Sequence, residues 1–209
     1  MPTPATATRG GPDAVPDHHH DLERVQAGRL LVANPLLPDP NFDRTVVFLL
    51  ACSDEGALGV VLNRPSETLL AAPLPRWEHL AAMPAVVFVG GPVQHEAVIC
   101  LARTLAHPAS DGPPGGWRAV TPDVGTLDLD LDPDGLQSAF SRVRIFVGYA
   151  GWGSGQLEGE IAAGAWWVVD AQPDDVFSEA PGDLWVRVLR RQKGSLALVA
   201  AYPPDPALN

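Results

Sequence analysis

The stretch RVRIFVGYAGWGSGQLEGEI, residues 142–161, joins an apolar run to a segment with helical spacing. Residues 142–149 predict a β-strand, because β-branched and aromatic residues dominate them. Residues 154–164 predict a helix. Glycines crowd the junction between the two, at positions 148, 151, 153 and 155. A glycine-rich turn between a strand and a helix is typical of phosphate-binding sites, so the first question is whether this turn binds phosphate.

The spacing of these glycines does not satisfy the known phosphate motifs. The dinucleotide fingerprint G-x-G-x-x-G fails because Gln156 or Glu158 stands where its third glycine is required. The P-loop motif G-x-x-x-x-G-K-[ST] is absent because Ser154 stands in place of the lysine that reaches the phosphates. The nucleophile elbow G-x-S-x-G is absent because Trp152 and Gln156 stand in place of its two glycines. Two interpretations stay open: a tight turn over which Trp152 packs, or a turn whose backbone N–H groups contact an anionic ligand.

Short apolar runs separated by turn residues recur on both sides of this stretch. They predict further strands over residues 29–35, 44–51, 57–63, 85–91, 96–103, 117–122, 165–171 and 196–203. Further helices are predicted over residues 132–141, with Asp132 as N-cap and Pro133 at the first position, and over residues 181–194. Many short strands with about three helices, without a strict β–α alternation, predict an α+β or mixed α/β fold.

The 209 residues suit one domain behind an N-terminal head. Residues 1–27 are expected to be a disordered head, because their first 20 or so are rich in Pro, Gly and Ala and lack apolar periodicity. Residues 28–209 are expected to form the domain, with residues 107–116 as a loop. The head lacks the apolar core of a secretory signal, and no apolar window approaches the length of a membrane helix, so the expected location is the cytoplasm.

Charge and residue usage argue against several function classes. With 25 acidic and 14 basic residues, direct binding to nucleic acid is not expected. His79, His95 and His107 show no metal-ligand spacing, so we expect no metal site, and no cofactor motif is present. Cys52 and Cys100 lie in apolar runs and are expected to be buried, unreactive thiols.

The densest basic group of the chain comes near its end. It consists of Arg187, Arg190, Arg191 and Lys193. Their spacing predicts the polar side and last turn of a helix, where cations interact favourably with the helix dipole. A phosphate-binding patch is the alternative interpretation.

Polar residues gather at three further strand ends, in NPLLPDPNFDR (34–44), NRPS (63–66) and GGPVQHE (90–96). Polar side chains at several strand ends can converge on one pocket, or can simply form turns, and composition does not separate the two. The residues predicted to line a ligand site, with Arg64 as the group that pairs with an anion, are Asn63, Arg64, Gly148, Trp152 and Gln156. The alternative is a hydrolase- or transferase-type enzyme whose carboxylate and arginine come from Asp43, Arg44, Arg64 and Glu158.

Five blocks stand in order along the chain: ANPLLPDPNFDRTVVFLL, GALGVVLNRP, VGGPVQHEAVICL, GYAGWGSGQLEGEI and YPPDPALN. Together they resemble the YqgE/AlgH family of bacterial proteins, from about Gly28 to Asn209. The resemblance implies a single α/β domain with a bifurcated, barrel-like β-sheet. It brings no established catalytic or binding residues and no cofactor, and it specifies neither a partner nor an oligomeric state.

Some members of that family are labelled transcriptional regulators, through a link to the control of exopolysaccharide (alginate). This chain gives direct DNA binding little support, because its charge has the wrong sign and no helix-turn-helix is recognisable. We therefore expect a cytoplasmic binding or regulatory domain for a small-molecule or protein partner. An enzyme is the alternative, and a transcriptional regulator is a lesser one.

Overall fold

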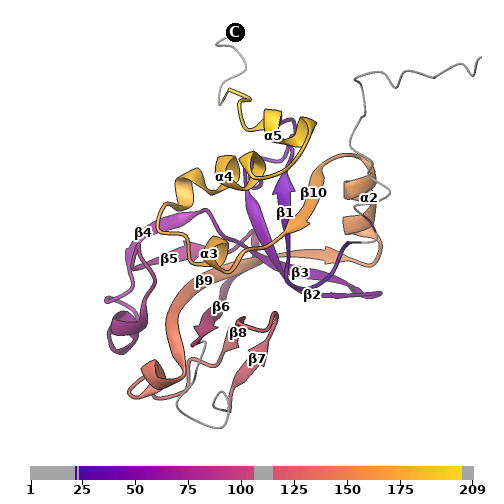
Figure 1. Cartoon of the computed structure of the whole chain (residues 1–209). Helices are drawn as coiled ribbons and strands as arrows, with labels where there is room; N and C mark the ends of the chain where they lie inside the picture. The colour runs from indigo at the N-terminus through magenta and orange to yellow at the C-terminus, as the bar shows by residue number, and fades with distance from the viewer. Residues whose placement is uncertain (1–21, 23, 106–114, 204–209) are drawn as a thin grey trace, which may run out of the picture.

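The computed structural model describes residues 22, 24–105 and 115–203. Ten strands form a curled half-barrel sheet in the order β10-β1-β2-β3-β9-β6-β8-β7, and β4 and β5 branch from it at β9 (Figure 1). This confirms the α+β class and the bifurcated sheet expected from the sequence. Most of the predicted head and most of the predicted loop at 107–116 lie outside the described residues.

The strands are β1 (Arg29–Ala33), β2 (Val46–Ser53), β3 (Gly56–Val61), β4 (Pro65–Leu69), β5 (Val86–Val89), β6 (Val93–Thr104), β7 (Trp117–Ala119), β8 (Val124–Leu127), β9 (Phe140–Gly153) and β10 (Trp166–Asp170). The helices are α2 (Gln156–Ala162), α3 (Pro173–Val176), α4 (Leu184–Arg190) and α5 (Ser195–Val199). The described residues also form three 3-10 turns: η1 (Pro75–Leu80), η2 (Leu136–Ser138) and η3 (Pro181–Asp183). No helix in this part of the chain is long and apolar enough to cross a membrane.

Strand β1, the first half of β2 and the second half of β3 are buried on both faces, because a helix covers each face. On one face Leu30 and Phe48 share a core with Trp185 of α4. On the other face Leu31 shares a core with Leu157 of α2. Figure 1 shows α4 and α2 on opposite sides of β1. Burial on two faces explains why these strands read as continuous apolar runs instead of alternating ones.

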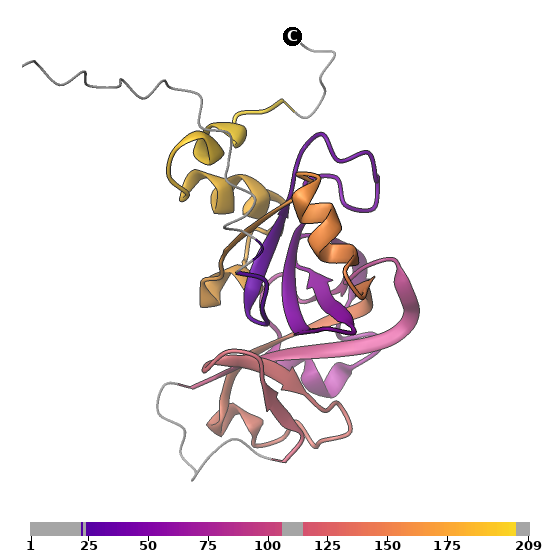
Figure 2. The same cartoon turned by 90° about the vertical axis from the view of Figure 1, so that its right-hand side faces the viewer.

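The other end of the sheet encloses a separate core. It is built by η1, η2 and strands β5 to β9, with Trp77, Phe140 and Ile145 among its buried members. Figure 2 shows β7 and β8 at the far end of the molecule from α4 and α5. The long strand β9 runs through both halves, and it therefore positions the residues of one half relative to the other.

The sheet forks at Gly148. Strand β9 pairs with β6 along one edge; along the other it pairs with β5 up to Val147 and with β3 from Ala150 onward. Backbones meet here without room for side chains. A Cβ on Gly90 would lie 2.3 Å from the Gly148 carbonyl oxygen, and one on Gly148 would lie 2.6 Å from that of Gly91. Three of the chain's glycines are thus required by the fork itself.

Arg144 of β9 ties two loops to the sheet from inside. It is 2% exposed, and no carboxylate pairs with it among the described residues. Its guanidinium donates to the carbonyls of Val176 (3.0 Å), Met83 (2.6 Å) and Ser178 (3.0 Å), and the ring of Phe88 lies 4.3 Å from its Cζ. Burial lowers the pKa of Arg144 to about 10, so the side chain is still protonated at neutral pH.

Two element predictions were wrong. Residues 132–141 form no α-helix: Asp132 accepts a bond from the backbone of Asp134, Gly135 has φ 95°, and only the turn η2 follows before β9 begins. Residues 196–203 form no strand. The helix α5 stands there, because Leu and Ala favour helices and because Leu196 and Val199 pack on the core beside α4.

The glycine-rich junction was also placed too early. Strand β9 continues to Gly153, so Gly148 and Gly151 lie in the strand and only Ser154 and Gly155 form the turn into α2. Gly155 is the N-cap, with φ 71°. Most of the glycines therefore serve the sheet and not the start of the helix.

Replacing Gly148 by alanine tests the fork. Gly148 and Gly155 have almost the same φ, 68° and 71°, but a Cβ has no neighbour within 4 Å at Gly155. We expect Gly155→Ala to lower the free energy of unfolding by about 1 kcal/mol, from backbone strain alone, and Gly148→Ala to lower it by about 3 kcal/mol or more. Urea denaturation measures both. Equal losses would show that the close approach to Gly91 has no cost.

Candidate functional site

Side chains of the connection between β1 and β2, residues 34–45, contact several parts of the molecule. Phe42 stacks on Trp152 with ring centroids 6.3 Å apart. Arg44 has φ 48° and places its Cζ 4.7 Å from the ring centre of Trp185. The same guanidinium donates to the carbonyls of Tyr202 and Pro203 near the C-terminus.

Asn63 fixes this connection from the end of β3. It is 6% exposed; its side-chain oxygen accepts a bond from the Val46 N–H (2.9 Å) and its amide group donates to the Arg44 carbonyl (2.8 Å). Both ends of the amide are therefore engaged with backbone. Asn63 therefore fixes the backbone of the β1–β2 connection at Arg44 and Val46.

A cavity of about 230 Å³ opens beside this connection. Its lining residues are Pro40, Asn41, Val61, Arg64, Val89, Gly91, Pro92 and His95. These residues come from all three polar strand ends that the sequence analysis singled out. The convergence of those ends on one pocket is therefore present in the structure.

Arg64 provides the positive charge of this cavity. It follows Asn63 directly, Pro65 comes next, and its Nη2 atom donates to the carbonyl of Asp43. None of the lining residues is acidic, and Arg64 has no ion pair with a carboxylate within the described ranges. The guanidinium is thus oriented by one backbone bond and keeps other N–H groups for a ligand.

The remaining three predicted ligand residues do not line this cavity. Gly148 supports it from behind, because its backbone packs on the lining residue Gly91. Trp152 and Gln156 belong to a separate cluster around Glu160. The indole N–H groups of Trp152 and Trp166 both donate to Glu160 Oε2, at 2.9 and 2.8 Å.

Gln156 closes the turn between β9 and α2. Its amide donates to Glu160 Oε1 (3.0 Å), and its side-chain oxygen accepts a bond from the backbone N–H of Gly153 (3.1 Å). Trp152 is only 6% exposed and packs against Phe42. Trp152 therefore packs beside a turn of only two residues, Ser154 and Gly155, and the tight turn expected over the whole glycine-rich stretch is confined to these two positions.

The structure does not assemble the carboxylate–arginine pair of the enzyme hypothesis. The side chains of Asp43 and Glu158 are exposed, and neither forms an ion pair with an arginine within the described part of the chain. Arg44 points to Trp185 and the C-terminal carbonyls, and none of these three candidates lines the cavity around Arg64. No group of three or more potential metal ligands occurs in the portion of the chain that the structure describes.

The comparisons with known proteins bear on this geometry. A family model described as AlgH-like (DUF179) matches residues 30–197, which include every lining residue of the cavity around Arg64. The chain belongs to the AlgH-like family. A UPF0301 protein of Streptomyces avermitilis is 52% identical over 182 residues, covering 87% of this chain and 94% of that protein. A UPF0301 protein of Streptomyces coelicolor is 51% identical over the same length and coverage.

Solved structures agree with this membership. The crystal structure of protein DIP2367 from Corynebacterium diphtheriae is 29% identical, with a TM-score of 0.78, and covers 84% of this chain and 91% of that one. The solution structure of the AlgH protein from Pseudomonas aeruginosa is also 29% identical, with a TM-score of 0.59 and coverage of 85% and 94%. The architecture described above is therefore that of the AlgH-like family.

His95 lines the cavity of this AlgH-like protein, although the spacing of the histidines had predicted no role for it. The signal was present in the third polar block, where Gly91 and Pro92 precede Gln94. Gln94, in the first residues of β6, has φ 44°, and the pairing of β6 with β9 is irregular between Val93 and Val98. His95 lies within this irregular part of the strand and lines the cavity with Arg64.

Asn63→Ala tests whether the amide holds the site. The change leaves the Val46 N–H and the Arg44 carbonyl without their partner, so we expect the free energy of unfolding to fall by about 2–4 kcal/mol. Asn41→Ala is the matched control, since Asn41 is exposed in the cavity wall; it should change stability by less than about 0.5 kcal/mol. A similar small change for both variants in urea denaturation contradicts the role of Asn63.

The two thiols of this AlgH-like domain provide a pH-dependent test. Cys100 is buried, as expected, whereas Cys52 is only half-buried. Burial raises the pKa of both thiols, and the charge of Glu158 raises that of Cys52 further. We expect Cys52 of the native protein to react slowly with a disulfide reagent at pH 8, with a rate that increases toward higher pH as thiolate forms.

Glu158→Gln should accelerate this reaction, because removing the negative charge lowers the pKa of Cys52 toward its ordinary value. Cys100 should react only in denaturant. An unchanged rate at Cys52 in Glu158→Gln would show that the Glu158 carboxylate does not act on the thiol.

Proposed function

We propose that this AlgH-like protein is a cytoplasmic binding domain whose cavity around Arg64 takes a small molecule with a carboxylate or phosphate group. One observation carries the proposal: three turns, distant in sequence, converge on a cavity that contains an arginine and a histidine and no acidic side chain. The chain as a whole has a net charge of −11. An acid-free cavity in so acidic a protein favours an anionic ligand.

The shape of the cavity supports a ligand with one charged end. Pro40, Val61, Val89 and Pro92 provide apolar walls, whereas Asn41, Arg64 and His95 provide polar groups. A guanidinium pairs well with a carboxylate or phosphate, because its N–H groups can bind two oxygens at once. The bond to the Asp43 carbonyl orients Arg64 before the ligand arrives, which reduces the entropy lost on binding.

A protein partner fits the same chemistry if a carboxylate of its chain enters the cavity. Val89, a lining residue, is 39% exposed and provides an apolar contact at the rim. If the ligand is a carboxylate of a protein partner, the domain has a regulatory role. A small-molecule ligand binds on its own, whereas a partner's carboxylate binds only as part of the partner protein.

A thermal-shift screen against small carboxylates, phosphates and nucleotides tests the proposal. A ligand at 100 times its dissociation constant adds about 2.7 kcal/mol, which for a domain of this size raises Tm by about 5–11 °C. We expect Arg64→Ala to abolish the shift. Arg190→Ala is the control, because it removes the same charge from an exposed position on α4.

A shift that Arg64→Ala retains in full would overturn the assignment of the site. If no small molecule shifts Tm, binding to proteins of the source cytosol is compared between wild type and Arg64→Ala. Binding that depends on Arg64 supports the protein-partner variant, and the absence of any such dependence counts against the site.

A further inference from the structure

A second cavity, of about 540 Å³, lies where the chain around α3 crosses one face of β6 and β9. Its lining residues are Arg142, Gln172, Asp174, Asp175, Phe177, Ser178, Glu179, Ala180 and Arg187. Its volume is within the range of small-molecule sites, about 300–1,000 Å³. It shares no lining residue with the cavity around Arg64.

Three arginines stand on the sheet face below this cavity. Arg103 of β6 and Arg142 of β9 are directly opposite each other in the antiparallel pair, and Arg144 follows two residues later on the same face. Like charges that lie opposite each other destabilise a sheet unless they are compensated. Burial is the main cause of the lowered pKa of Arg144, and the positive charge of Arg142 lowers it further.

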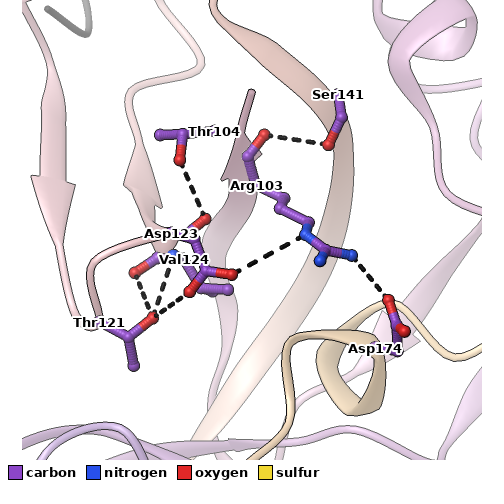
Figure 3. A network of polar contacts seen from close by, with 7 residues as sticks. All are labelled: Arg103, Thr104, Thr121, Asp123, Val124, Ser141 and Asp174. Atoms are coloured by element: carbon purple, nitrogen blue, oxygen red, sulfur yellow. Dashed lines mark hydrogen bonds and ion pairs between the residues drawn. The ribbon is translucent and has the colours of Figure 1, made fainter. Parts of the chain in front are cut away.

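Two of the three arginines have partners. Arg103 lies 2.6 Å from a carboxylate oxygen of Asp174 and 3.9 Å from one of Asp123, as Figure 3 shows. Arg144 is surrounded by backbone carbonyls. Arg142 has no ion pair within the described residues, although it lines the cavity.

Helix α4 contributes a second positive charge to the lining of this cavity. Arg187 donates to the hydroxyl of Ser178 (2.8 Å), and Ser178 is 3% exposed and lines the cavity. A serine hydroxyl that accepts such a bond still has its own proton to donate. The arrangement therefore aligns a guanidinium and a hydroxyl donor along one wall.

The carboxylates of the cavity are largely neutralised by arginines from outside it. Asp174 pairs with Arg103, and the buried Asp175 binds Arg191 through both oxygens, at 2.7 Å each. Only the exposed Glu179 is left as an acidic lining residue without an ion pair in the described part of the chain. Arg142 and Arg187 thus outnumber the free carboxylate.

We infer that this cavity binds a small ligand with two or more negative charges, such as a phosphate ester or pyrophosphate. The ligand bridges Arg142 on β9 and Arg187 on α4, with the Ser178 hydroxyl as a donor between them. Such a ligand would supply the anion that Arg142 lacks and would offset the repulsion between Arg142 and its neighbours Arg103 and Arg144. This site is separate from the one proposed around Arg64.

Isothermal titration calorimetry with pyrophosphate and citrate tests the inference, at constant ionic strength adjusted with NaCl. We expect binding to wild type and to Arg64→Ala, and a dissociation constant at least tenfold weaker in Arg142→Gln. Arg187→Gln should weaken binding to a similar extent and should be checked for folding, because it also removes the bond to Ser178. Arg190→Gln, on the exposed side of α4, is the charge control.

Three outcomes overturn the inference: no measurable binding of either probe to wild type, unchanged binding to Arg142→Gln, or equal losses in Arg142→Gln and Arg190→Gln. Loss of binding in Arg64→Ala with retention in Arg142→Gln assigns the anion to the other cavity and also overturns it. Arg142 forms no ion pair among the described residues, so we expect Arg142→Gln to fold. The Arg142→Gln variant therefore tests the inference even if Arg187→Gln is unstable.

Discussion

The guanidinium of Arg144 is the constraint on which the arrangement of this domain depends. A charge taken out of water is strongly destabilising unless hydrogen-bond partners replace the water that it loses. No carboxylate meets Arg144 among the described residues; carbonyls from Met83, Val176 and Ser178 bind its two Nη atoms, whereas its buried Nε has no partner there. The loop before β5 and the chain around α3 are thereby fixed over the same face of β9, and the walls of the second cavity take their positions from this contact.

Strand β9 connects this constraint to both candidate sites. Its first half carries Arg142 and Arg144, the glycine at its centre allows the sheet to fork, and its last residues reach the aromatic cluster around Glu160. The fork brings the Gly90–Gly91 turn against β9 and so sets the wall of the cavity around Arg64. One continuous strand therefore contributes to the position of both candidate sites.

Local sequence patterns predicted the strands well where both faces are buried, since an apolar run such as that of β2 is typical of a buried strand. They predicted the wrong element where tertiary packing decides between a strand and a helix. The apolar residues of α5 suit a strand or a helix, and they become a helix because they pack beside α4. Asp132 was expected to be the N-cap of a helix and is not: it accepts a bond from the Asp134 N–H, but Gly135 has φ 95° and is itself the N-cap of the short turn η2.

The candidate sites show the same division. Convergence of the three polar blocks was foreseeable, because turn residues at strand ends meet when the strands are neighbours. Which of those residues line the cavity was not, since the fork at Gly148 decides that through contacts distant in sequence. The second cavity was harder still to predict: Arg142 and Arg187 are 45 positions apart, and the basic group near the end of the chain predicted a helix surface or, as the alternative, a phosphate-binding patch without Arg142.

Residues 41–44 form four different contacts from four consecutive positions, which limits how this segment can vary. Each of these four consecutive positions acts on a different part of the molecule. Asn41 lines a cavity, Phe42 stacks on Trp152, the carbonyl of Asp43 holds Arg64, and Arg44 holds the carbonyls near the C-terminus. An insertion or deletion of one residue would place the wrong side chain at every one of these contacts. The spacing of these residues must therefore be kept, whereas the side chain of Asp43 is free to differ, because its contact uses the backbone carbonyl.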